Sequence, residues 1–135
     1  MSAYAMPALQ GKAGGNIRPM RVVKISTVTD NTFLESASNT SANIGIAQQG
    51  TRRAPGTADD DGFAAIAGEN IMVFGAGSIA PAQYGATVTR GDKVTSDGNG
   101  LLLTTTTTAD VVVGWAFQSG AVGDIVAIIV GPFVL

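Results

Sequence analysis

Hydrophobic and polar positions near the end of the chain predict two buried strands separated by a Gly/Ser turn. In residues 111–117 one strand face would carry Val111, Val113, Trp115 and Phe117, so Trp115 is expected to anchor a core. Residues 123–130 follow, and the strand they predict is apolar on both faces. A strand of that kind lies in a closed barrel or beneath another subunit.

The same pattern occurs earlier in the chain. Residues 43–47 repeat the apolar–Gly–apolar–Ala order of residues 113–116, and residues 68–74 match residues 123–129. This predicts one small β unit used twice. The distance from Gly45 to Gly114 is 69 residues, whereas Gly68 to Gly123 is 55, so the first copy carries 14 extra residues between about Thr51 and Ala67. Binding residues often lie on such loops of a rigid scaffold.

The rest of the chain has the alternation and turn residues of short strands. Strands are expected at residues 21–28, 32–35, 44–48, 70–74, 86–89, 93–95 and 101–108, with a tight turn at residues 96–100. One helical turn is expected at residues 63–67. Short strands with Gly-rich turns predict an all-β, single-domain small barrel or sandwich.

Residues 1–19 differ from the remainder and predict an extended N-terminal arm on a β domain of residues 20–135, with the inserted loop at about residues 51–67. Pro7, Pro19 and three glycines argue against regular structure in the arm. Four cationic side chains, Lys12, Arg18, Arg21 and Lys24, occur in the first 24 residues without an acidic one.

Composition narrows the chemistry. The chain has no Cys and no His, which excludes Ser-His-Asp and Cys-His catalysis and most transition-metal sites. The acidic run 59–61 lacks the oxygen ligand that a Ca²⁺ loop needs at Phe63. No paired carboxylates or Ser-Lys dyad are evident. We therefore expect no enzyme activity, no cofactor and no metal.

Charge and hydropathy bear on partners. The net charge of −2 argues against nucleic acid, and the longest apolar run, residues 125–135, is too short for a membrane helix of about 20 residues. Only 13% of residues are charged, which suits a protein that covers much of its surface with partner proteins.

The order of these motifs carries a resemblance. Residues 85–94, the turn 96–100, the segment Val113-Gly114-Trp115-Ala116 and residues 123–126 resemble the capsid cement or head-decoration proteins of tailed bacteriophages, over about residues 40–131. The resemblance implies a virion protein made in the host cytoplasm and added to the outer capsid surface, commonly as homotrimers, where it clamps neighbouring major capsid subunits.

Under this interpretation the arm and the inserted loop would contact the capsid. The expected contact residues are Ile17, Arg18, Met20, Arg21, Arg52 and Arg53, with the arginines binding capsid carboxylates. Removing residues 1–19 would then weaken capsid binding and leave thermal unfolding nearly unchanged. A tail- or fibre-associated β module and a small-ligand-binding β-barrel with a dry cavity near Trp115 are the alternatives.

Overall fold

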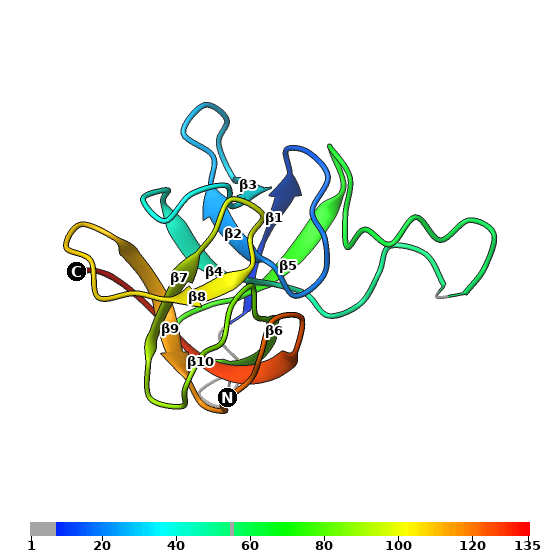
Figure 1. The fold of residues 1–135 in the computed structure, drawn as a ribbon. Coiled ribbons are helices and arrows are strands. Elements are labelled where there is room, and N and C mark those ends of the chain that lie inside the picture. The colour runs from blue at the N-terminus through cyan, green and yellow to red at the C-terminus, as the bar shows by residue number, and fades with distance from the viewer. Residues whose placement is uncertain (1–7, 55) are drawn as a thin grey trace, which may run out of the picture.

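The computed structural model describes residues 8–54 and 56–135, and these residues are all-β (Figure 1). The strands are β1 (Ala8–Ala13), β2 (Val22–Ile25), β3 (Thr32–Glu35), β4 (Asn43–Ala47), β5 (Asn70–Phe74), β6 (Ile79–Gln83), β7 (Lys93–Ser96), β8 (Leu102–Thr104), β9 (Val111–Ala116) and β10 (Ile125–Val134). Within the described ranges no helix is long and apolar enough to cross a membrane. The all-β prediction is confirmed.

The strands form two units of five. The first is a closed barrel in the order β1-β3-β2-β4-β5, which we call the first barrel. The second is a sheet in the order β6-β10-β9-β7-β8, which we call the second sheet. Its edge strands β6 and β8 meet at a parallel bridge between Tyr84 and Leu102, and the N–H of Gly85 donates to the Leu102 carbonyl at 2.7 Å.

The two units have the same topology, strand for strand. Strands β1 to β5 correspond to β6 to β10, because every ladder of one unit recurs between the corresponding strands of the other. The parallel β1–β3 ladder, which pairs Ala13 with Phe33, corresponds to the single bridge between Tyr84 and Leu102. The prediction of one β unit used twice is therefore confirmed, and it extends over the whole described chain.

Isolated bridges outside the strands also correspond. Ile17 bridges Ala65 in the first unit, and Val88 bridges Gly120 in the second. The extra residues of the first unit lie between Ala47 and Ala65, an interval that overlaps the region of about Thr51 to Ala67 where the repeat spacing predicted them. The expected helical turn at residues 63–67 is wrong, because Ala65 is held in an extended bridge.

Other local expectations also need correction. Ala8–Ala13 falls inside the expected arm but forms β1, which closes the first barrel between β3 and β5. Residues 1–7, the start of that arm, lie outside the described residues. Ile79–Gln83 forms a strand that the pattern missed, whereas residues 86–89 form none, and only Leu102–Thr104 of the expected strand 101–108 is extended. Strand β10 continues through Gly131 and Pro132 with a shift of register.

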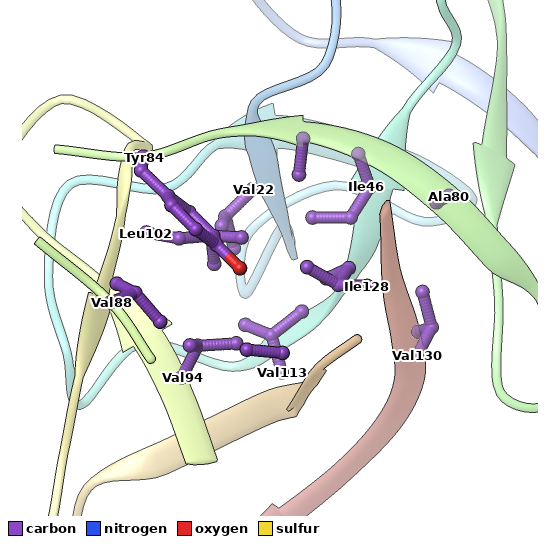
Figure 2. Packing of buried hydrophobic residues seen from close by; sticks show 12 residues of the cluster. Val22, Ile46, Ala80, Tyr84, Val88, Val94, Leu102, Val113, Ile128 and Val130 are labelled. Carbon is purple, nitrogen blue, oxygen red and sulfur yellow. The ribbon is translucent and has the colours of Figure 1, made fainter. Parts of the chain in front are cut away.

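Two hydrophobic clusters hold the fold together. One fills the first barrel and includes Ile17, Val23 and Ile71, all at most 2% exposed. The other lies inside the second sheet, and Val22 and Ile46 of the first barrel also belong to it. In Figure 2 the Val22 side chain lies beside Leu102, and the Ile46 side chain lies near Ile128, in the same cluster. The outer surface of the first barrel thus completes the core of the second sheet.

Candidate functional site

The segment between β4 and β5 is the most prominent projection of the molecule. Figure 1 shows it extending away from the first barrel as a long loop that includes residues 51–54 and 56–63. At its base the Arg52 N–H donates to the Phe63 carbonyl at 2.9 Å. The Arg52 guanidinium donates through Nε and a terminal nitrogen to the two Glu69 carboxylate oxygens, at 2.7 and 3.0 Å. Its other terminal nitrogen reaches Asp61 at 2.9 Å.

In this arrangement the charge of Arg52 is paired with carboxylates of the same chain. All three guanidinium nitrogens donate to carboxylates, and the side chain is only 15% exposed. The hydrogen bond from Arg52, and then that from the Ile66 N–H, lowers the pKa of Glu69 to about 2. Arg52 therefore fastens the loop to the start of β5, and three of its five guanidinium N–H donors are paired within the chain.

The acidic run of the loop has a structural role in the turns. Asp60 accepts hydrogen bonds from the N–H groups of Gly56 and Gly62, at 3.3 and 2.9 Å. Asp61 accepts one from the Phe63 N–H at 3.1 Å while it pairs with Arg52. These are the contacts of acidic turn residues, which bond to backbone N–H groups nearby. They give the loop a defined shape beyond its anchor.

Arg53 differs from its neighbour because it is exposed. Its carbonyl accepts a hydrogen bond from the Thr51 hydroxyl at 2.5 Å, and its charge is among those that lower the pKa of Glu69. Beside the loop base lies a polar hollow of about 550 Å³, which Lys12, Arg52 and Glu69 help to line. The loop therefore presents Arg53 to solvent next to a polar depression.

The two arginines of the N-terminal region lie where the first barrel meets the second sheet. Arg18 makes a bidentate pair with Glu35 of β3, at 3.0 and 2.8 Å, and also donates to the Asn99 carbonyl at 3.2 Å. Arg21 donates to the same carbonyl at 2.8 Å. Asn99 belongs to the turn between β7 and β8, so both arginines join the two halves of the chain.

The pKa values of Arg18 and Arg21 shift in opposite directions. The bond to Glu35 raises the pKa of Arg18, whereas desolvation, and then the charge of Arg18, lowers the pKa of Arg21. The Arg21 Nε is buried without a partner among the described residues. The junction therefore already engages both of these arginines, which the sequence assigned to contacts with a capsid.

Ile17 and Met20 are placed differently from each other. Ile17 is fully buried in the first barrel and exchanges backbone hydrogen bonds with Ala64 and Ala65 at 2.8 to 3.4 Å. Its side chain is therefore a core residue and cannot anchor in a partner's pocket. Met20 is half-buried and has a φ of 59°, and its carbonyl accepts a hydrogen bond from the Gln83 N–H at 3.3 Å.

A surface that sequence reasoning missed lies on the outside of the second sheet. Trp115 is 41% exposed, so the expectation that it anchors the core is wrong. Its ring stacks on Phe133 with 6.2 Å between centroids, and Lys93 Nζ lies 5.2 Å above it. Ile129, which pairs with Trp115 in register, is also exposed. The Trp115 side chain faces away from Ala116, which is buried in the core, but both faces of β9 carry apolar residues, so the sequence carries no clear signal.

Comparisons with known proteins bear on the fold. No protein-family model matches the sequence, and no curated protein sequence matches it. Among solved structures, the chain is similar to the head fiber gp8.5 N base of bacteriophage phi29, with a TM-score of 0.60 and 18% sequence identity. The match covers 96% of this chain and 98% of that one. The paired β units described above are thus also the architecture of a phage head fiber base.

Proposed function

We propose that this chain is a structural protein of a phage virion that binds the outer surface of the head and clamps neighbouring major capsid subunits. The observation that carries the proposal is the end-to-end similarity of fold to the head fiber base of phi29. The sequence motifs independently resemble head-decoration proteins. Self-association, as the homotrimer that the resemblance implies, belongs to the same proposal.

The structure supports a clamping role through rigidity and one projecting element. One of the two core clusters contains residues of both β units, so the packed interior can transmit force from one unit to the other. The loop of residues 51–63 extends from this scaffold with a fixed base and an exposed Arg53. Many weak contacts of this kind, multiplied over a closed shell, give strong overall attachment.

Arg53 is the contact residue that the geometry favours among those expected. Ile17 is in the core, Arg52 holds the loop, and Arg18 and Arg21 bind Asn99. A free guanidinium can make a bidentate pair with a capsid carboxylate. We propose Arg53 as the principal cationic contact and Met20 and Arg18, both partly exposed, as secondary ones.

The test is co-sedimentation of the purified chain with phage heads stripped of accessory proteins, with tails as a control. Saturable binding to heads at a fixed ratio to the major capsid protein is expected. Arg53→Ala should weaken binding about tenfold. Arg90→Ala removes a comparably exposed arginine from a turn of the second sheet and should bind normally. Absence of binding to heads would refute the proposal.

A second candidate function is the base of a fibre, favoured by what the similar structure is described to be, a head fiber base. The two functions differ in what else is attached, because a fibre base carries a projecting appendage. Electron micrographs of labelled virions would show label at the root of fibres, along the tail, or spread over the head surface. The first outcome would replace decoration by fibre attachment, and the second would place the chain on the tail.

The ligand-binding alternative receives no support from the geometry. It requires an enclosed dry cavity beside Trp115, but the Trp115 side chain lies on the outer surface, and the inside of the second sheet is filled by buried side chains such as Val113 and Ile128. We therefore do not propose it.

A further inference from the structure

The first barrel binds the second sheet through a surface whose counterpart on the second sheet makes no such contact. In the first barrel, Val22, Ile46 and Phe74 lie side by side on β2, β4 and β5, since Val22 pairs with Ile46 and Ile46 with Phe74. Val22 and Ile46 are fully buried in the core of the second sheet, and Phe74 packs against it. This row is the surface by which the first barrel binds the second sheet.

The corresponding row of the second sheet is exposed. Lys93 pairs with Trp115, Trp115 with Ile129, and Ile129 with Ile79, across β7, β9, β10 and β6. Trp115 is 41% exposed, Ile129 37% and Ile79 54%. We call these four residues the outer row. At the positions where the first barrel buries Ile46 and Phe74, the second sheet offers Trp115 and Ile129 to solvent.

The surface of the second sheet that contacts Val22 and Ile46 also has a counterpart on the first barrel. That counterpart is not covered by any part of the described chain. In the second sheet, the side chains that share a cluster with Val22 and Ile46 include Ala80, Leu102 and Val113. Their counterparts in the first barrel are Leu9, Phe33 and Ile44. Those three, with Ile25, line an apolar hollow of about 440 Å³. We call these four residues the mouth.

Exposure confirms that the mouth is open where its counterpart is covered. Leu9 is 39% exposed and Ile25 46%, and Phe33 and Ile44 are half-buried. In the second sheet, by contrast, all four corresponding residues, Ala80, Ser96, Leu102 and Val113, are fully buried. The chain therefore carries one free apolar row and one free apolar hollow whose counterparts bind each other within the same molecule.

We propose that the outer row of one copy docks in the mouth of another copy, reproducing between chains the contact that Val22 and Ile46 make within the chain. The contact is head-to-tail, because each chain contributes a different surface to each of its two neighbours. Such contacts close into rings when the rotation between copies permits. The proposal concerns copies of this chain and stands whether or not the chain binds phage heads.

Two pairs of substitutions separate the surfaces. Trp115→Glu with Ile129→Glu removes the outer row and leaves the mouth, whereas Leu9→Glu with Ile25→Glu does the reverse. All four side chains are at least 37% exposed, so each variant should keep the wild-type circular dichroism and melting temperature. Ala121→Glu with Val122→Glu is the matched control, because it adds the same charge at exposed residues outside both surfaces.

Sedimentation equilibrium of the purified chain at micromolar concentrations then tests the proposal. The wild type and the control should associate beyond a monomer, and each altered variant should be monomeric. Burying an unpaired carboxylate should weaken the contact about 100-fold or more. An equimolar mixture of the two variants has one intact row and one intact mouth, so it should form a complex of one chain of each and nothing larger.

Fluorescence of that mixture adds a direct readout, because Trp115 is the single tryptophan of the sequence and only the mouth-altered chain retains it. Its emission should shift to shorter wavelength on mixing, as the ring leaves water. A monomeric wild type would overturn the proposal. A mixture that stays monomeric would also overturn it, since a contact between identical surfaces would not be restored by mixing.

Discussion

Gly45 and Gly114 occupy corresponding positions in the two halves of the chain, and each lies against a backbone carbonyl of the neighbouring strand. A Cβ on Gly45 would lie 2.1 Å from the Phe74 oxygen, and one on Gly114 would lie 2.0 Å from the Ile129 oxygen. Real Cβ atoms do not approach carbonyl oxygens so closely. The two strand pairs β4–β5 and β9–β10 can therefore form only with glycine at these positions.

Gly45→Ala and Gly114→Ala should each destabilise the fold by about 3 kcal/mol, because the added methyl must separate two paired strands. Gly131→Ala is the matched control: it lies in β10 with no atom within 4 Å of a built Cβ, and it should be nearly neutral. Urea unfolding of the three variants measures the effect. Equal stabilities would contradict the close approach.

Ile17→Ala should cost about 3 kcal/mol of unfolding free energy, since a fully buried side chain is removed from the first barrel. Removing residues 1–19 should cost more, because it also deletes β1 and opens the barrel. Val28→Ala, at a position 92% exposed, is the control and should melt like the wild type. The expectation that residues 1–19 can be removed without effect on unfolding is thereby reversed, and thermal denaturation decides between the two.

Stability in acid should depend on the Arg52–Glu69 pair. The pKa of Glu69 falls from its ordinary 4.5 to about 2 in the folded chain, so the pair stabilises fully above about pH 4.5 and is lost as the pH falls toward 2. Glu69→Gln should therefore reduce the difference in stability between pH 5 and pH 2. Carbon NMR of the Glu69 carboxyl measures the pKa directly, and a midpoint near 4.5 would contradict the pairing.

Glu69→Gln should also loosen the projecting loop, because the three N–H donors that bind the Glu69 carboxylate, two from Arg52 and one from Ile66, then face a neutral amide. Limited proteolysis between residues 51 and 63 should become faster, while cleavage elsewhere stays unchanged. Glu35→Gln breaks the other bidentate arginine pair and is the matched control for loop cleavage. Equal acceleration by both variants would point to a general loss of stability.

Tyr84 should make stability fall at high pH. Burial, and then the charge of Asp92, raises its pKa above the ordinary 10.0, so its contribution is present below about pH 10 and is lost as the pH rises through the raised value. Tyr84→Phe removes the 2.7 Å hydrogen bond to the Gln118 carbonyl and should cost about 1 kcal/mol at pH 7. The difference between variant and wild type should shrink above pH 10 in urea unfolding.

The repeat and its insertion could be predicted from the sequence because glycine is required at matching places. Gly45 and Gly114 sit in the same apolar surroundings, and the shorter spacing from Gly68 to Gly123 revealed the extra residues. Hydrophobic periodicity also predicted most strands near their observed bounds. It failed for β6, where Pro81 stands in the middle of the strand and proline is unusual in strand interiors.

Strand β1 was not predicted because a glycine can either interrupt a strand or allow a strand to pack closely. In the sequence Gly11 argues against regular structure. In the first barrel, however, a Cβ on Gly11 would lie 2.7 Å from the Phe33 ring. The glycine thus permits β1 to pack closely. Sequence spacing gives no sign of which use applies, because the contact joins residues far apart in the chain.

The candidate contact residues could be predicted only in part. An arginine pattern does not reveal whether a carboxylate of the same chain will meet it, and Glu35 and Glu69 each lie 17 residues from the arginine they bind. The exposed Trp115 was missed because β9 contains apolar residues on both faces, so the pattern did not say which face met water.

The unequal loops of the two halves give the molecule a ready place for engineering. The first half carries 14 more residues between Ala47 and Ala65 than the second carries between Ala116 and Gly120, on the same strand framework. The framework therefore closes with either loop length. A foreign peptide inserted between Ala116 and Gly120 would be displayed from the second half as the natural loop is from the first, which makes this chain a scaffold for presenting a peptide.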